Sequence, residues 1–172
     1  NARVINLGLG GPRDRLLERL LAAAAARGAV IVAAADSRYA DGGFPASQRG
    51  VIAVAQAGDR RPLPAGAWLA PGADVPATLP GGRWGLVSGS SYAAAHVAGL
   101  AALVLELRPG APPALVRRAF AALPRTALVA HDPGREQEQA GSIDACATIA
   151  RAAGACVCLC PTPTAATAEL LP

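Results

Sequence analysis

Two continuous apolar runs of strand length limit the folds that this chain can adopt. Residues 29–35 read AVIVAAA and residues 50–55 read GVIAVA, without alternation between apolar and polar side chains. A strand that is apolar at every position needs cover on both faces, and parallel strands between two layers of helices have that cover. The two runs therefore predict a parallel sheet buried inside an α/β domain.

The residues before the first run complete a β-α-β unit. Residues 3–7 read RVINL and lead into the glycine-rich turn GLGGP, which indicates a buried strand followed by a tight turn. Leucine and alanine recur at helical spacing over residues 16–24, and Arg27 and Gly28 provide the cationic last turn and the terminal glycine of a helix. This order of elements predicts a right-handed parallel crossover.

Composition sets further limits. Of the 172 residues, 43 are alanine, so the core must be built by close approach of backbones. The 16 basic residues are all arginine and are spread along the chain, and the net charge of +4 forms no patch, which argues against a nucleic-acid partner. The longest alanine-leucine run, residues 100–107, contains Glu106 and is too short to cross a bilayer, so no membrane span is expected.

The middle of the chain is predicted as loops followed by a central helix. Residues 58–88 are rich in glycine and proline and are interpreted as loops and a ribbon lying against the sheet, with short extended pieces at residues 67–70 and 83–87. From residue 90 or 91 to about residue 107 the chain is apolar on all sides, which is typical of a helix buried in the middle of a fold.

Further helices are expected over residues 112–123 and 143–153. The domain is predicted to cover residues 1–153, with residues 154–172 forming a separate tail rich in cysteine, proline and threonine. The sequence shows neither an initiating methionine nor a charged and apolar leader, so we expect it to begin inside a longer protein.

A pair of serines follows a glycine directly at the start of the central helix. Ser90 and Ser91 lie in the segment GSSYAAAHVAG, residues 89–99. A helix N-terminus offers free N–H groups and about half a positive charge, which stabilises an alkoxide or a tetrahedral oxyanion. Such a position favours a nucleophilic serine, and the alternative is a serine that only caps the helix.

The same segment resembles the nucleophile motif G-T-S-x-A-x-P-H-V-A-G of subtilisin-like serine peptidases, with Ser91 at the nucleophile position. Ser90 replaces the usual threonine and Ala95 the usual proline. Other family motifs occur in the same order over residues 2–150: VINLGLGGP, FPAS followed by VIAV, APGADV and GSIDA. The resemblance implies a doubly wound, mostly parallel sheet with helices on both faces, incomplete in this chain.

The resemblance also implies a serine endopeptidase that acts on polypeptide substrates. Its triad takes the order Asp, His, Ser, so the motifs D-[ST]-G and H-G-T should lie upstream, in the N-terminal half of the same domain. Neither motif occurs here. His96 is expected to be a packed, hydrogen-bonded core histidine and His131 to be solvated, so this chain alone lacks a base. The alternative function is a non-catalytic pseudopeptidase or peptide-binding module.

Two residues are candidates for the side-chain donor of the oxyanion hole. The family reads A-A-A-G-N where this chain reads AAADS, and an ungapped alignment places Ser37 at the asparagine, whereas a shift by one places Asp36 there. A serine hydroxyl donates over a shorter reach, and an aspartate donates only when it is protonated. Asp36 is alternatively a turn residue that ends the strand.

A substrate cleft is expected beside these residues. By resemblance, Gly8, Leu9 and Gly10 act as an edge strand to which an extended peptide adds through main-chain hydrogen bonds. Leu9, Ala34 and Ala35 are candidate walls of an apolar pocket next to the scissile bond. These segments contain no acidic residue that would favour a basic substrate side chain, unless Asp36 faces the pocket.

Cofactors and location are less constrained. The four cysteines lack C-x-x-C spacing, which argues against a zinc site, and they fit either disulfides of an exported protein or an unpaired cluster. A structural calcium ion is compatible with the resemblance, although no site can be assigned to it. The resemblance places the protein outside the cytoplasm, as a secreted, periplasmic or cell-surface protein.

Overall fold

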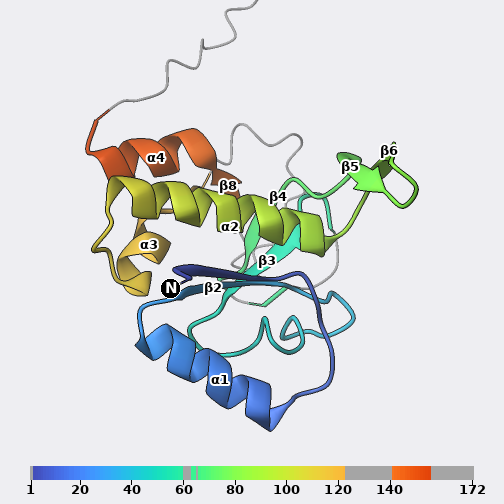
Figure 1. Ribbon diagram of the computed structural model, residues 1–172, viewed down its shortest axis with the longest axis horizontal. Helices are drawn as coiled ribbons and strands as arrows, with labels where there is room; N and C mark the ends of the chain where they lie inside the picture. Colours follow the sequence, from blue (N-terminus) through green and yellow to red (C-terminus); the bar gives the residue numbers. More distant parts are fainter. Residues whose placement is uncertain (1, 60–62, 65, 123–140, 156–172) are drawn as a thin grey trace, which may run out of the picture.

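A six-stranded sheet forms the centre of this computed structural model, which describes residues 2–59, 63–64, 66–122 and 141–155 (Figure 1). The strand order is β1-β2-β3-β4-β8-β7, in which β1 to β4 and β8 run parallel and β7 pairs antiparallel with β8. The strands are β1 (Val4–Leu7), β2 (Val30–Ala34), β3 (Ile52–Gln56), β4 (Trp68–Ala70), β7 (Ala121–Ala122) and β8 (Gly141–Asp144).

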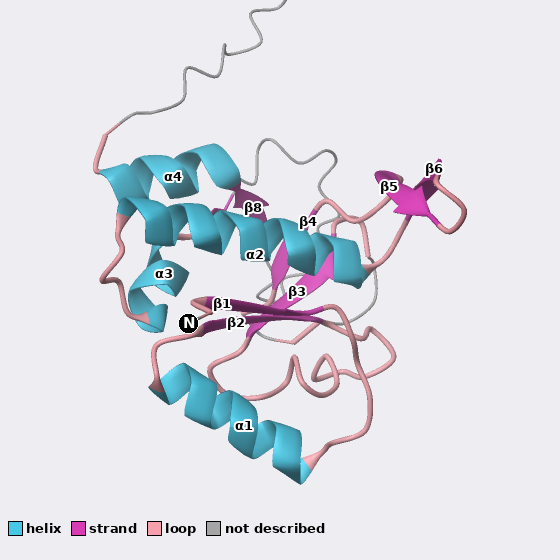
Figure 2. Ribbon diagram, in the orientation of Figure 1, coloured by secondary structure: helices cyan, strands magenta, loops and turns pink. Residues whose placement is uncertain are grey.

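Helices cover both faces of this sheet, which confirms the predicted doubly wound class (Figure 2). One face carries α1 (Arg15–Ala26), and the other carries α2 (Ser90–Leu107), with α3 (Pro113–Ala119) and α4 (Ala145–Ala153) packed beside it. Among the described strands, β1 lies at one edge of the sheet and pairs with β2.

Alternate residues of β2 face the two helical layers. Val30, Val32 and Ala34 belong to the core cluster under α2, whereas Ile31 and Ala33 belong to the cluster under α1. All five side chains are buried. The absence of polar alternation in this run therefore has the cause predicted for it, because both faces of the strand are covered.

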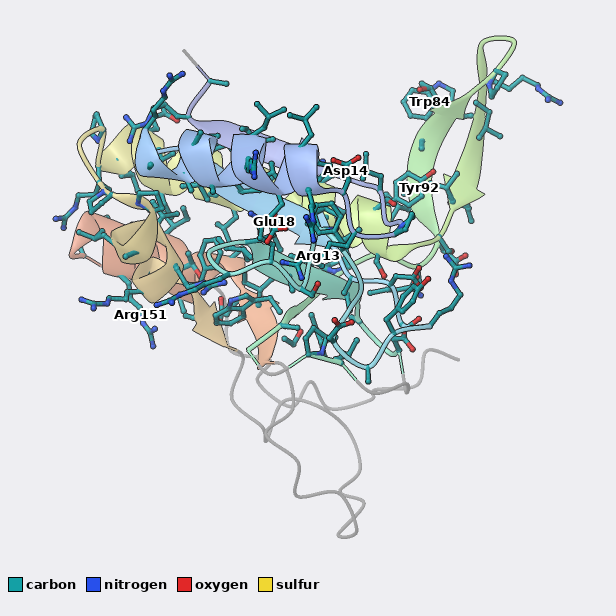
Figure 3. The ribbon with its side chains drawn as sticks, turned by 90° about the horizontal axis from the view of Figure 1, so that it is seen from below. Arg13, Asp14, Glu18, Trp84, Tyr92 and Arg151 are labelled. Atoms are coloured by element: carbon teal, nitrogen blue, oxygen red, sulfur yellow. The ribbon has the colours of Figure 1, made fainter. Side chains whose placement is uncertain are left out.

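Local capping explains where α1 begins and ends. The Asp14 side chain accepts a hydrogen bond of 2.7 Å from the Leu17 amide, and Arg13 forms an ion pair of 2.6 Å with Glu18 (Figure 3). The hydrogen bond with Arg13 lowers the pKa of Glu18 below its ordinary value. The helix ends before Gly28, which has a positive φ of 90°.

In this chain α2 is buried on one side only, so the expectation of a buried central helix holds for the face toward the sheet. The face toward the sheet is fully covered, but the opposite face is exposed, and Leu103 on it is 50% exposed. No element in the described part of the chain covers that face. The exposed residues recur at helical spacing: Ala95, His96, Gly99, Ala102, Leu103, Glu106 and Leu107.

Helix α2 has the length and composition of a membrane span. Over its 18 residues the mean hydropathy is 1.4, so by these two properties it is long and apolar enough to cross a membrane. It includes residues 90–99 in addition to the alanine-leucine run of residues 100–107, and the serines and the histidine in residues 90–99 interrupt the apolar run without making it strongly charged. In the structure α2 packs on β1, β2, β3 and β4. A helix that packs in a protein core can have the same length and hydropathy as a membrane span.

The glycine-rich segment before α2 differs from its prediction in two ways. Residues 68–70 form β4, a full member of the sheet, rather than an extended piece outside it. Strands β5 (Val75–Leu79) and β6 (Arg83–Val87) form a hairpin that extends away from the sheet (Figures 1 and 3). Trp84 is 75% exposed and Leu86 67% exposed on this hairpin, so it does not lie against the sheet as predicted.

Two predicted helices are shorter than expected. Helix α3 ends at Ala119, and Phe120 caps it before the chain enters β7. The Phe120 ring makes an edge contact with Trp68 at a ring-centroid distance of 5.7 Å. Residues 141–144, of which two were assigned to the last helix, form β8, and Asp144 caps α4 instead. The proposed tail falls outside the described residues from 156 onward.

The buried Thr148 hydroxyl joins α4 to β7 and gives the first prediction. Its Oγ1 donates to the Asp144 carbonyl at 2.6 Å and accepts from the Ala121 amide at 2.9 Å. Thr148→Val leaves that buried amide without a partner, so we expect a loss of about 1–3 kcal/mol in the free energy of unfolding, measured with urea. Thr148→Ser keeps the hydroxyl and should lose clearly less; equal losses would contradict this explanation.

Candidate active site

Ser91 is the second residue of α2 and does not cap it. The N-cap is Gly89, which makes no side-chain capping bond, so the alternative reading of Ser90 or Ser91 as a simple cap is wrong. Ser91 instead lies in the first turn, where the partial positive charge of the helix is greatest. The chain therefore presents a hydroxyl at the positive end of an 18-residue helix.

A close contact between two glycines holds the turn before Ser91. The Gly89 amide donates to the Gly72 carbonyl at 2.7 Å, and Gly89 has a φ of 155°. A Cβ on Gly72 would lie 2.8 Å from the Gly89 carbonyl oxygen and 3.1 Å from the Ala93 Cβ. Gly72 belongs to the APG segment noted in the sequence, but its role as the support of the Ser91 turn was not predicted.

The Ser91 side chain touches the predicted substrate segment. Its Oγ donates to the Gly8 carbonyl at 2.7 Å, although 83 positions separate the two residues. Gly8 follows β1, whose outer side pairs with no strand in the described part of the sheet. The nucleophile candidate therefore lies against the segment at which an added peptide strand would end.

Gly8 and Gly10 each lie next to one of the candidate side chains. A Cβ on Gly8 would lie 3.2 Å from the Ser91 Cβ, and a Cβ on Gly10 would lie 3.5 Å from the Asp36 Cβ. Ser91 and Asp36 therefore lie beside glycines that are two residues apart in the segment. Leu9, between them, is 53% exposed.

Asp36 is held in an ion pair. The Arg38 guanidinium donates to both carboxylate oxygens through Nε, and through its NH2 group at 2.7 Å, and the Arg38 amide donates to Oδ1 at 3.0 Å. This hydrogen bonding, followed by charge attraction, raises the pKa of Arg38 above its ordinary value. Arg38 was not among the residues predicted from the sequence, although a basic residue two positions after an acidic one in a predicted turn is a signal for such a pair.

The remaining candidates surround this ion pair. Ser37 is half-buried in the turn after β2. Ala34 and Ala35 are 7% and 4% exposed, and they belong to the core clusters under α2 and α1, respectively. They therefore face opposite sides of the sheet and cannot both line one side of a pocket.

His96 is the histidine that the structure describes, and it bonds within its own helix. His96 is exposed on α2, and its Nδ1 lies 3.0 Å from the Tyr92 carbonyl oxygen one turn earlier. The prediction of a packed core histidine is therefore wrong here, because no described element covers this face of α2. His131 lies outside the described residues.

The remaining sequence predictions concern metal sites and cysteines. In the described ranges, no group of three or more His, Cys, Asp or Glu side chains is placed to hold a metal ion. Cys146 is half-buried on α4. The other three cysteines lie outside the described residues.

Comparison with known proteins assigns the family. The sequence profile of the Subtilase family matches residues 1–141. The chain belongs to the subtilase family. A subtilisin of Bacillus pumilus is 39% identical over 122 residues, which cover 63% of this chain and 44% of that protein. Subtilisin E of Bacillus subtilis strain 168 is 38% identical over 122 residues, which cover 63% of this chain and 32% of that protein.

Solved protease structures share the fold of this subtilase. Patellamide maturation protease PatA aligns with a TM-score of 0.69 at 29% identity, over 90% of this subtilase and 64% of that chain. A protease from Pseudoalteromonas arctica aligns with a TM-score of 0.71 at 27% identity, over 88% and 51% of the two chains. This subtilase thus spans less than half of the curated relatives named above and contains an incomplete version of the fold.

The contact between Gly72 and the Gly89 turn predicts a local sensitivity. Gly72→Ala places a methyl group against backbone that cannot move aside cheaply, so we expect a loss of about 1–3 kcal/mol in the free energy of unfolding, measured with urea. Gly110→Ala is the matched control, because a Cβ there meets nothing within 4 Å. Equal stability of the two variants would show that the turn adapts freely.

Proposed function

We propose that this subtilase is part of a serine endopeptidase that hydrolyses peptide bonds through an acyl-enzyme. The observation that carries the proposal is the Ser91 hydroxyl, at the positive end of α2 and 2.7 Å from the carbonyl of the substrate segment at Gly8. The relatives and structural neighbours are subtilisins and proteases, which supports the same reaction. This chain supplies the nucleophile, part of the oxyanion hole and the substrate strand.

The substrate binds as an added strand in this proposal. An extended peptide pairs with residues 8–10 at the edge beyond β1, and main-chain hydrogen bonds provide affinity for any sequence. The scissile carbonyl then lies beside Ser91. Peptide-bond hydrolysis next requires a base to remove the hydroxyl proton, and the Asp and His of the triad are proposed to lie upstream of this chain.

The negative charge of the tetrahedral intermediate develops at the N-terminus of α2. The Ser91 amide and the helix dipole stabilise the oxyanion. Ser37 is the side-chain donor that we favour. The ion pair with Arg38 supports this choice over Asp36, because a carboxylate held by a guanidinium is ionised and accepts hydrogen bonds without donating any.

A non-catalytic peptide-binding subtilase is the second candidate. It is favoured by one observation, which is that in the described residues the Ser91 hydroxyl donates to a backbone carbonyl rather than to a histidine. A carbonyl cannot retain a proton, so this partner does not activate the serine. In that case residues 8–10 still bind a peptide, but no acyl-enzyme forms.

We also propose that the protein is exported, on the basis of its similarity to subtilisins.

Covalent labelling separates the two candidates. We expect the full-length protein to react with a fluorophosphonate probe, Ser91→Ala to abolish the labelling, and Ser90→Ala to retain it, because the Ser91 hydroxyl contacts the substrate segment. In-gel fluorescence and peptide mapping measure the site. Labelling that survives Ser91→Ala would remove the nucleophile assignment, and no labelling of the unchanged protein would favour the peptide-binding candidate.

The oxyanion assignment has its own test. Ser37→Asn should raise kcat toward an apolar peptide substrate by lengthening the donor, and Ser37→Ala should lower it, within the range of about 10²–10³ associated with such a donor. Steady-state kinetics of the full-length protein measure both. A rise with Asp36→Asn and none with Ser37→Asn would assign the donor to position 36, and a loss in both Asn variants would leave the hole to backbone groups.

A further inference from the structure

The carboxylate of Asp36 lies within side-chain reach of Ser91 along the substrate segment. Gly8 contacts Ser91 and Gly10 contacts Asp36, and the two glycines are two residues apart. Two residues span at most about 7 Å. A peptide residue whose carbonyl lies at Ser91 therefore needs a long side chain to reach the carboxylate.

No side chain of Gly8 or Gly10 lies between Ser91 and the Asp36 carboxylate. Neither Gly8 nor Gly10 carries a side chain, and a Cβ on Gly10 would lie 3.7 Å from Asp36 Oδ2. Gly43 approaches from the other side, where a Cβ would lie 3.4 Å from the Asp36 Cβ. The Asp36 side chain is 15% exposed, so the carboxylate is partly removed from water and still reachable.

The position of Asp36 is also fixed by its backbone. Its amide donates to the Gly42 carbonyl at 2.8 Å, and its carbonyl accepts from the Tyr39 amide at 3.0 Å. A charge held in a fixed place discriminates between substrates better than one on a mobile loop, because no ordering is needed at binding.

From these contacts we propose that Asp36 makes the active site prefer arginine or lysine at the substrate residue that donates the scissile carbonyl. Both side chains combine the required length with a positive charge. The inference rests on the proposed function for the position of the scissile bond. It replaces the expectation of a purely apolar pocket with an acidic side chain at the far end of that pocket.

Arg38 occupies the position of the substrate cation in the free protein. Its side chain is 76% exposed and reaches the carboxylate from two residues away. The Arg38 guanidinium can return to water when a substrate guanidinium or ammonium group takes its place at the carboxylate. The carboxylate keeps a cationic partner throughout this exchange. Arg38 thus weakens the preference for basic substrates without abolishing it.

Matched peptides test the preference in the full-length protein. We expect kcat/KM to be roughly tenfold higher for a peptide with arginine at this position than for the same peptide with citrulline, its neutral analogue. Asp36→Asn should bring this ratio close to one, and Arg38→Ala should increase it. Glu106→Gln removes a charge from the exposed C-terminal end of α2, 15 residues after Ser91, and should leave the ratio unchanged.

The outcomes separate this inference from the proposed function. Ser91-dependent cleavage with equal rates for both peptides, or a ratio that persists in Asp36→Asn, overturns the inference and leaves the peptidase standing. Absence of any cleavage counts against the proposed function. The Ser91→Ala protein is then titrated with both peptides by calorimetry, where tighter binding of the arginine peptide that is lost on Asp36→Asn supports the inference and equal affinities overturn it.

Discussion

The close approach of α2 to the sheet is the contact on which the rest of the site depends. Ala93, Ala94 and Ala101 are fully buried on the face that meets the strands, and their small side chains let the helix lie near the backbone below it. Its first turn then reaches the carboxyl ends of the parallel strands, where Ser91 meets Gly8. Larger side chains at these positions would lift the helix and break this contact. The alanine content of the sequence is therefore a structural requirement at this interface.

Sequence reasoning succeeded where the signal is local and failed where it depends on distant partners. Strands β2 and β3 are predictable because each run has no polar residue and contains the strand-forming residues valine and isoleucine. Strand β4 has three residues and owes its place to pairing with Gln56 and the residues before it on one side and with Gly141 on the other. The glycine- and proline-rich sequence around β4 contains no pattern that predicts this pairing.

The candidate site likewise combines residues that local sequence motifs identify with contacts that only the folded chain creates. A motif of neighbouring residues identifies Ser91, and the glycine-rich turn GLGGP places Gly8 at the end of a predicted strand. The motif does not say that Asp36 faces Gly10, because that contact follows from the packing of a loop against a strand extension. The exposure of His96 was missed for a related reason. An apolar helix predicts burial, but burial also needs a second surface, and no sequence pattern within α2 provides one.

Two opposite charges flank residues 8–10 and give a bound peptide a direction. The positive end of α2 lies beside Gly8, and the carboxylate of Asp36 lies beside Gly10. In the proposed reaction the helix end attracts the carbonyl oxygen, which becomes negative, while Asp36 attracts a cationic side chain of the same residue. The two attractions act on groups that leave one Cα in different directions, so they constrain its rotation as well as its position. Orientation of this kind lowers the entropic part of the barrier. An apolar side chain would lack the second constraint, and its carbonyl would be held by main-chain hydrogen bonds and the helix end alone.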